Sequence, residues 1–372
     1  MVVLHVVPFL TVGGVELHLL TLCRFLKLAG HTPVVVTLRG EYDDGARSLR
    51  ADFDLSGVPV HDLKSAGYWD LSSVLKLSAL VRELCPDLLH THLPRSDWVM
   101  ALSRLAGRRV PWICSVHAIY SKTWSGKWTL PLFKSVWRRA DAVIAISHAV
   151  RDWLVNEQRM QAEKVRVIHY GIDSAPFVSP KEDLRKLWGL EDRVLLGSVG
   201  RLEPGKRHEC LITAMPAILE KVPRACLLIA GHDPRAHGRK LEALIERLGL
   251  NGHVRLLNFQ EDISSFLKAL DLFVFPSVSE GFGQAVIEAM AAGRPVVASA
   301  IPPLTEIVLT GETGVLVEPD NPQAFADASS WLFAHPEEAR RMGERGRERV
   351  YSHFNAEKMA AETLSLYHQL TS

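Results

Sequence analysis

The sequence predicts an α/β protein with two Rossmann-like domains, each a parallel sheet covered by helices. Short Val-, Leu- and Ile-rich runs alternate with helical patterns along the whole chain. These runs are continuously apolar rather than alternating, which is typical of strands buried on both faces of a parallel sheet. A Pro-containing stretch over 174–180 has no apolar period and divides the runs into two sets. The length of 372 residues fits about two to three domains.

The strands predicted by these runs follow in chain order. The first set lies at 2–7, 33–37, 88–91, 112–116, 142–145 and 165–168. The second set lies at 194–200, 226–231, 254–257, 272–275, 295–298 and 315–317. The stretch 355–372 has the apolar spacing of an amphipathic helix.

Composition excludes several classes of protein. The 43 basic and 42 acidic residues nearly balance, so no overall attraction to nucleic acid is expected. The five cysteines form no Cys-x-x-Cys pair, which favours reduced thiols over zinc or disulfides. The first residues are apolar without a basic leader, and no window approaches a membrane span, so we expect a cytoplasmic protein.

The segment 279–295 carries the most informative motif. It follows the apolar run 272–276, and its glycines form a turn that lets backbone N–H groups approach a ligand. A helix is predicted over 282–292, and a strand, a glycine turn and a helix N-terminus together form an anion site. Glu280 lies in the turn and Glu288 in the helix, where a carboxylate can hold vicinal hydroxyls. A diphosphate with hydroxyl-bearing rings at both ends describes a sugar nucleotide.

Two cations follow the predicted strand 194–200. Arg201 and Lys206 lie at its carboxyl end, the edge where ligands of open α/β sheets collect. Cations there can neutralise a leaving diphosphate, whose charge grows as the bond to the sugar breaks. The alternative is a solvated pair of loop charges.

These motifs resemble those of glycosyltransferase family 4, the retaining transferases of GT-B fold, over nearly the whole chain. The Glu-x7-Glu pair that starts at Glu280 resembles the donor-site signature of this family. Residues 200–206 resemble its Gly-Arg-Leu-x-x-x-Lys segment, with Arg207 where glycine is usual. Three further segments resemble family motifs: 13–16, 86–92 and 170–173.

The resemblance implies the GT-B architecture, in which two Rossmann-like domains have parallel sheets that face each other across a cleft. Residues 1–176 would form the acceptor domain and residues 177–354 the nucleotide-sugar donor domain. The final helix over 355–372 is expected to pack back on the first domain.

The resemblance also implies roles for individual residues. Arg201 and Lys206 would clamp the donor diphosphate, and Glu288 would hold the ribose. Glu280 would face the donor sugar and stabilise a positive anomeric centre by charge, by hydrogen bonding or as a nucleophile, and the sequence leaves these alternatives open. Backbone groups of two glycine turns would approach the donor: Gly13, Gly14, Gly281, Phe282 and Gly283.

Three histidines follow or end predicted strands of the first domain. His117 follows strand 112–116 and resembles a family histidine that contacts the donor sugar, as a base or a positioning group. His90 and His92 are spaced for one face of a strand, which suggests a metal, but the sequence offers no third ligand at useful spacing. We therefore predict no metal and no cofactor besides the nucleotide-sugar co-substrate.

The segment 98–140 departs from the rest of the chain in composition. It contains eight Lys or Arg residues, five Trp and no Asp or Glu. This mixture suits an anionic membrane surface and a lipid-linked acceptor. The alternative is a core-facing helix with a basic outer face.

The predicted function is retaining transfer of a sugar from a nucleoside-diphosphate sugar, with uridine as base, to a hydroxyl of a glycan or glycolipid acceptor. Polysaccharide or lipopolysaccharide synthesis for the cell envelope is the expected setting, at the inner face of the cytoplasmic membrane if the protein is peripheral. The alternatives are a sugar-nucleotide epimerase of the same fold and a non-catalytic sugar-nucleotide-binding protein. Donor sugar, acceptor and oligomeric state do not follow from the sequence.

Overall fold

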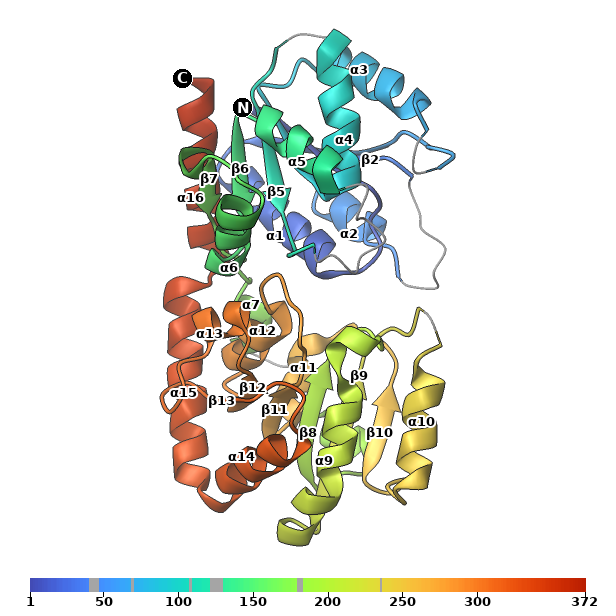
Figure 1. Cartoon of the computed structure of the whole chain (residues 1–372), viewed down its shortest axis with the longest axis vertical. Helices are drawn as coiled ribbons and strands as arrows, with labels where there is room; N and C mark the ends of the chain where they lie inside the picture. Colours follow the sequence, from blue (N-terminus) through green and yellow to red (C-terminus); the bar gives the residue numbers. More distant parts are fainter. Residues whose placement is uncertain (40–46, 68–69, 107–108, 121–129, 179–182, 235) are drawn as a thin grey trace. The chain divides into compact units, whose positions relative to one another are not determined.

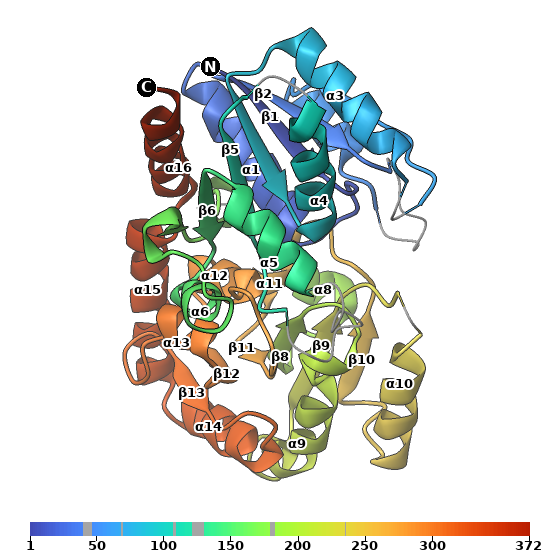
Figure 2. The ribbon, with the colours of Figure 1, turned by 45° about the horizontal axis from the view of Figure 1, so that its top comes forward.

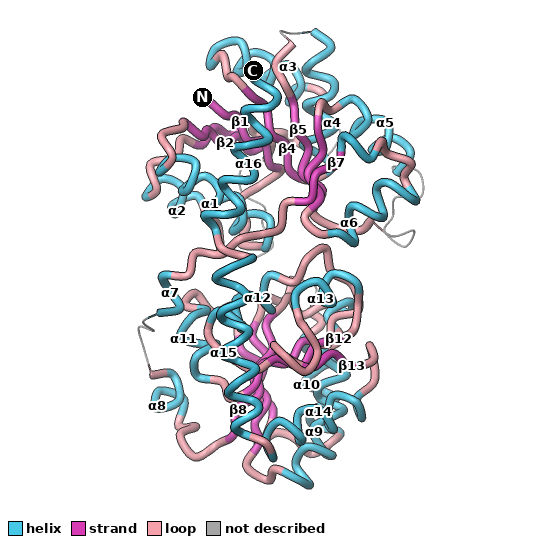
Figure 3. The backbone as a smooth tube through the Cα atoms, turned by 90° about the vertical axis from the view of Figure 1, so that its left-hand side faces the viewer, coloured by secondary structure: helices cyan, strands magenta, loops and turns pink. Residues whose placement is uncertain are grey.

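The chain forms two compact units, each a parallel sheet flanked by helices (Figure 1, Figure 3). The computed structural model describes residues 1–39, 47–67, 70–106, 109–120, 130–178, 183–234 and 236–372. Unit 1 comprises Met1–Gly171 and Ala356–Ser372, and unit 2 comprises Ile172–Asn355. The chain therefore changes unit a few residues before the boundary expected at 176.

Over the residues that the structure describes, unit 1 is built on a seven-stranded sheet in the order β3-β2-β1-β4-β5-β6-β7, with parallel neighbours. Its strands are β1 Val2–Val7, β2 Thr32–Thr37, β3 Val60–Asp62, β4 Leu88–His92, β5 Trp112–Val116, β6 Ala142–Ala145 and β7 Val165–Val167. Its α-helices are α1 Gly14–Leu28, α2 Arg50–Leu55, α3 Ser72–Leu84, α4 Pro94–Ser103, α5 Leu130–Arg139, α6 His148–Asp152 and α16 Ala356–Thr371. The sequence prediction missed β3, because three partly buried residues at a sheet edge produce no apolar run.

The last helix, α16, belongs to unit 1 although it ends the chain. Its residues Met359, Leu366 and Tyr367 join a buried cluster with Val3 of β1 and Leu22 of α1. Figure 2 shows α16 alongside α1, and the two helices pack together. The apolar face of α16 therefore completes the core on one side of the unit 1 sheet.

The described part of unit 2 is built on a six-stranded parallel sheet in the order β10-β9-β8-β11-β12-β13. Its strands are β8 Val194–Val199, β9 Ala225–Ala230, β10 Val254–Leu257, β11 Leu272–Phe275, β12 Val296–Ser299 and β13 Val315–Val317. Its α-helices are α7 Ala175–Val178, α8 Leu184–Trp188, α9 His208–Lys221, α10 Gly238–Arg247, α11 Ile263–Ala269, α12 Gln284–Ala291, α13 Pro302–Ile307, α14 Pro322–Ala334 and α15 Pro336–His353.

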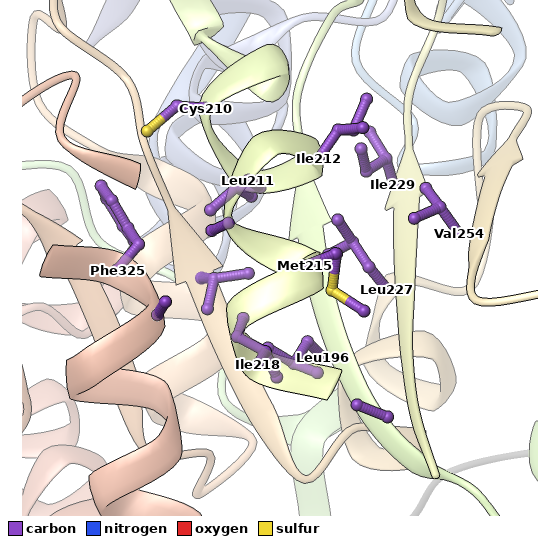
Figure 4. Close-up of a cluster of buried hydrophobic side chains, with 14 of the residues drawn as sticks. Leu196, Cys210, Leu211, Ile212, Met215, Ile218, Leu227, Ile229, Val254 and Phe325 are labelled. Carbon is purple, nitrogen blue, oxygen red and sulfur yellow. The ribbon is translucent and has the colours of Figure 1, made fainter. Parts of the chain in front are cut away.

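One large buried cluster of unit 2 lies between its sheet and the helices α9 and α14 (Figure 4). Leu211 and Met215 of α9 pack against Leu227 and Ile229 of β9, and Phe325 of α14 closes the cluster. These side chains are at most 3% exposed. Each fully buried side chain of this size contributes about 1.5–3 kcal/mol, so the core holds the site-bearing strand ends in fixed positions.

Both sheets reverse their strand order beside their first strand. In unit 1 the order reverses between β1 and β4, and in unit 2 between β8 and β11. Loops that leave the carboxyl ends of two such strands run to opposite sides, so a crevice opens between them, and ligands of open α/β sheets bind there. The residues after β1, β4, β8 and β11 are therefore the first place to look for function.

Candidate functional site

The unit 2 site lies at this reversal of strand order. Arg201 and Lys206 follow β8, and Glu280 follows β11, the strand beside it. The fold thus places both cations after one strand and the carboxylate after the next, and it brings Lys206 into contact with Glu280. Lys206 and Glu280 are 74 residues apart in the chain, and the parallel pairing of β8 with β11 makes them neighbours.

The loop after β8 is held against its neighbours by its own backbone. The Val278 amide and the Ser277 hydroxyl both donate to the Gly205 carbonyl, at 3.2 and 3.3 Å. A Cβ on Gly231, after β9, would lie 1.9 Å from the Gly200 carbonyl oxygen, so glycine is required there. The loop that carries the two cations is therefore anchored from both adjoining strands.

Lys206 and Glu280 form an ion pair. Lys206 Nζ donates to Glu280 Oε1 at 2.6 Å and also lies 5.6 Å from the centre of the Phe275 ring. The side chains of Lys206 and Glu280 are only 18% and 12% exposed. A pair so shielded from water interacts more strongly than a surface pair, because the surrounding dielectric constant is lower.

Arg201 is far more exposed to solvent than Lys206. Its side chain is 62% exposed and its guanidinium lies 3.1 Å from a Glu203 carboxylate oxygen. An exposed ion pair contributes little to stability, so Arg201 can turn to a ligand at small cost.

The second glycine turn leads into α12. Gly283 has φ +124°, and a Cβ there would lie 2.5 Å from Leu304 Cδ2, so the turn requires glycine. Because of this turn the helix begins at Gln284 rather than at 282 as predicted. Phe282 is 2% exposed and its ring packs against that of Phe354, so only its backbone can serve a ligand. Gly281 lies in the same turn, between Glu280 and Phe282.

Glu288 lies one turn inside α12. Its Oε1 accepts a hydrogen bond of 3.0 Å from the Gln284 amide. Desolvation raises the pKa of Glu288 to about 7, although the hydrogen bond from Gln284 lowers it. A carboxyl group in such surroundings is poised to accept hydrogen bonds from ligand hydroxyls, which would replace the lost water.

In unit 1 the glycine turn after β1 begins helix α1. Gly13 is the residue before the helix and Gly14 its first residue. Glu16, in the first helical turn, is 4% exposed, and its Oε2 lies 2.6 Å from the position a Cβ would take on Gly13. The turn is therefore packed directly on a buried carboxylate, a feature that the sequence motif did not reveal.

His117 follows β5 as predicted, but both of its ring nitrogens have partners within unit 1. Nε2 lies 3.1 Å from His92 Nδ1, and Nδ1 lies 2.6 Å from the Tyr170 hydroxyl. Burial holds the pKa of His117 well below its usual range. The ring is thus neutral, and to act as a base it would first have to give up one of these bonds.

His90 and His92 lie on the same face of β4, together with a third histidine that the spacing could not reveal. The parallel register sets His5 of β1 opposite His90, and the ligand nitrogens of these three rings lie within 4.8 Å of one another. His90 bonds to the hydroxyls of Tyr367 and Ser115, at 2.6 and 2.7 Å. The rings are therefore already part of a hydrogen-bond network.

Comparison with known proteins places these two units in one family. The model described as glycosyl transferases group 1 matches residues 180–349, and the model described as Glycosyltransferase Family 4 matches residues 12–175. The chain belongs to glycosyltransferase family 4. It is therefore a glycosyltransferase of the hexosyltransferase type.

Individual relatives agree with this assignment. The lipopolysaccharide core biosynthesis mannosyltransferase LpcC of Rhizobium leguminosarum bv. viciae is 30% identical over 77% of this chain and 76% of its own length. The N-acetyl-alpha-D-glucosaminyl L-malate synthase of Bacillus anthracis is 26% identical over 81% of this chain and 80% of its own. The family 4 chain thus has a relative in lipopolysaccharide synthesis.

The fold of the family 4 chain is that of known GT-B structures. The crystal structure of Anabaena HepE, in complex with UDP and glucose, matches with a TM-score of 0.88 at 23% identity and covers 100% of both chains. The predicted architecture of two Rossmann-like α/β domains is therefore confirmed.

The tryptophans of the family 4 enzyme's basic segment do not form a surface patch where the structure describes them. Trp112 and Trp137 are completely buried. The Trp137 indole donates to Asp97 Oδ2 at 2.8 Å, and the Trp112 indole donates to Thr91 Oγ1, which in turn donates to Asp97 Oδ1 at 2.5 Å. These two rings are core residues, so the expectation that they face a membrane is wrong.

The structure describes some of the basic residues of the segment 98–140 and not others. Arg109, Arg138 and Arg139 are exposed and Lys134 is partly exposed, whereas Arg104 pairs with Asp141 at 3.1 Å. Trp98 is partly buried. Arg108, Lys122, Trp124, Lys127 and Trp128 lie outside the described residues. Over the part of the chain that is described, no helix combines the length and apolarity that a membrane span needs.

Proposed function

We propose that this enzyme is a retaining glycosyltransferase that moves a sugar from a uridine-diphosphate sugar to a hydroxyl of a glycan or glycolipid acceptor of the cell envelope. The Lys206–Glu280 pair carries the proposal, because it sets a cation for the diphosphate beside a carboxylate for the sugar, 2.6 Å apart. The uridine assignment draws support from HepE, a fold neighbour crystallised with UDP. The envelope assignment draws support from the LpcC relative.

The proposed leaving-group site uses charges and backbone dipoles. Lys206 and Arg201 oppose the negative charge that grows on the diphosphate as the sugar departs. Helix α12 begins directly after Gly283 in the chain, and its first backbone N–H groups offer further hydrogen bonds to phosphate oxygens. Glu288, inside the same helix, accepts hydrogen bonds from the ribose hydroxyls.

The ion pair exchanges partners when the donor binds. Without donor, Lys206 and Glu280 neutralise each other. A diphosphate beside Lys206 competes for the ammonium group, and the Glu280 carboxylate is then available to stabilise the positive anomeric carbon. The binding energy of the diphosphate thus releases the carboxylate only when a substrate is present.

This site works without a divalent ion in our proposal. The two cations supply the charge neutralisation that a metal provides in other transferases. The nucleotide sugar is then the only small-molecule co-substrate.

The exposed cations of segment 98–140 suit peripheral binding to an anionic membrane surface, on the cytoplasmic side. Arg109, Arg138 and Arg139 are the described, exposed members of this set. Each cation close to an anionic leaflet contributes about 1 kcal/mol, so a few of them support reversible binding.

A panel of UDP-, GDP- and ADP-sugars, incubated with the full chain, tests the proposed function. Without acceptor, we expect slow release of UDP from one UDP-sugar. With an acceptor present, the transferred sugar should keep the anomeric configuration that it had in the donor. The Glu280→Gln variant is the control and should release little UDP. An isomerised nucleotide sugar without UDP release would indicate an epimerase, and binding without either product would indicate a non-catalytic protein.

A further inference from the structure

One face of the unit 1 sheet buries five histidines next to one another. They are His5, His18, His90, His92 and His117, and none is more than 7% exposed. Burial is the main cause that lowers the pKa of each ring. The rings are therefore neutral near pH 7, and each carries one N–H donor and one bare nitrogen.

Three of these rings form a single hydrogen-bonded chain that ends on a tyrosine. We call His5, His92 and His117 the histidine chain. His5 Nδ1 lies 3.2 Å from His92 Nε2, and His92 Nδ1 lies 3.1 Å from His117 Nε2. His117 Nδ1 lies 2.6 Å from the Tyr170 hydroxyl. Since every link needs one donor and one acceptor, a single direction runs through the whole histidine chain.

The buried end of the histidine chain favours one of the two directions. Among the described residues, His5 Nε2 is a buried nitrogen without a hydrogen-bond partner. If the chain ran toward His5, this nitrogen would carry an unsatisfied N–H group, which is rare in protein interiors. If it runs away from His5, the nitrogen is bare, and an unused lone pair is the smaller penalty.

The other end favours the same direction. Glu16 is buried under the glycine turn of α1. Burial raises the pKa of Tyr170, and the charge of Glu16 raises it further. The Tyr170 proton therefore stays on the hydroxyl, and the nearby anion attracts the positive end of every N–H and O–H dipole in the chain.

We propose that the histidine chain is a positioning device for the α1 turn, in which every ring carries its proton on Nδ1 and the Tyr170 hydroxyl is held as a donor toward Glu16. His5 and His92 thereby act through His117 and Tyr170, and they touch no substrate. The chain ends at a buried nitrogen, so it fixes hydrogen-bond direction and does not conduct protons. Its effect on transfer rests on the proposed function and on the role that the family resemblance gives to Gly13 and Gly14, whose backbone groups would approach the donor.

The protonation pattern is tested without any activity measurement. Nitrogen-15 spectra of the full chain, with labelled histidine, distinguish the Nδ1–H from the Nε2–H tautomer of each ring. We expect His5, His92 and His117 to be Nδ1–H, with no titration between pH 6 and 8. An Nε2–H signal for His117 would reverse the direction and overturn the proposal, whether or not the enzyme proves to be a transferase.

Two variants of His92 separate positioning from packing. An Asn side chain places its amide group near the position of the ring Nδ1, so His92→Asn keeps a donor for His117. A Gln side chain places its amide group near the position of Nε2, so His92→Gln keeps only the contact with His5. We expect His92→Asn to retain the His117 tautomer and most of the transfer rate. In His92→Gln the tautomer of His117 should no longer be fixed. We expect kcat to fall about five- to tenfold, which corresponds to the loss of about one hydrogen bond.

Tyr170→Phe provides an independent check at the other end of the histidine chain. It removes the terminal donor, so kcat should fall about as far as in His92→Gln, and the double variant should be no slower than either single one, since both break one chain. Additive losses, or equal activity of His92→Asn and His92→Gln, would overturn the proposal. Zinc titration that broadens the His5, His90 and His92 signals would overturn it too, and would assign a metal centre instead.

Discussion

Replacing Lys206 should impair both catalysis and the stability of unit 2. Lys206→Met removes the ammonium group that donates to Glu280 at 2.6 Å but keeps an apolar stem against the Phe275 ring. Loss of a preorganised charge at the leaving group costs about 2–4 kcal/mol of transition-state stabilisation, or roughly 30- to 1000-fold in kcat.

The expected stability loss follows from the shielding of the pair. The two side chains are 18% and 12% exposed, so Glu280 would stay partly buried without its partner. Leaving one charged member of a hydrogen bond unsatisfied costs about 1–3 kcal/mol. Chemical denaturation of the variant, compared with wild type, measures this loss, and initial rates of donor hydrolysis measure the change in kcat.

Two matched variants separate the contributions. Arg201→Ala should lower kcat to a similar degree but leave stability within about 0.5 kcal/mol of wild type, because its side chain is 62% exposed. Lys206→Met combined with Glu280→Gln should recover the stability lost in the single variant, since the uncompensated carboxylate is gone, but it should not recover activity. Near wild-type turnover of Lys206→Met, or an equal loss of stability in Arg201→Ala, would refute the reasoning.

Three further predictions concern other parts of the molecule. Folding raises the pKa of Glu288 from its ordinary value of 4.5 to about 7, so the folded protein binds this proton more tightly than the unfolded chain does. The free energy of unfolding of the protein should therefore decrease as pH rises between these two values. The Glu288→Gln variant should lack this slope in denaturant melts, and an identical slope would contradict the shift. Donor hydrolysis should proceed equally with and without EDTA, and a reversible loss on chelation would argue against the cation clamp. Replacing Lys134, Arg138 and Arg139 together by Glu should reduce sedimentation with anionic liposomes at low salt but spare donor hydrolysis, and a wild-type protein that ignores such liposomes would favour a soluble acceptor.

The sheets of both units could be predicted from sequence because a strand buried on both faces leaves an uninterrupted apolar run. Ala142–Ala145 and Leu272–Phe275 were predicted with the bounds that the structure shows. The exceptions have local causes. The short strand Val60–Asp62 is only partly buried and shows no such run, and α12 begins late because Gly283 adopts a positive φ.

Contacts between distant residues could not be predicted in the same way. His5 becomes a neighbour of His90 only through the register of β1 with β4, so the spacing of His90 and His92 suggested an incomplete set. The composition of segment 98–140 predicts that Trp137 faces a membrane surface, but its indole N–H donates to the buried Asp97 carboxylate. Composition records which residues a segment contains, whereas hydrogen-bond demand in the core decides which of them stay at the surface.

The two units use the same place in the same topology for opposite electrostatic purposes. In unit 2 the reversal of strand order gathers opposite charges, and Lys206 pairs with a carboxylate that a donor phosphate replaces in the proposed mechanism. In unit 1 the equivalent place gathers neutral imidazoles, whose hydrogen bonds run one after another to Tyr170. A substitution in unit 2 should therefore act through charge and respond to ionic strength, whereas a conservative substitution in the histidine chain should act through geometry and respond little. Comparing the salt dependence of kcat for Lys206→Met and His92→Gln would separate the two kinds of site on one enzyme.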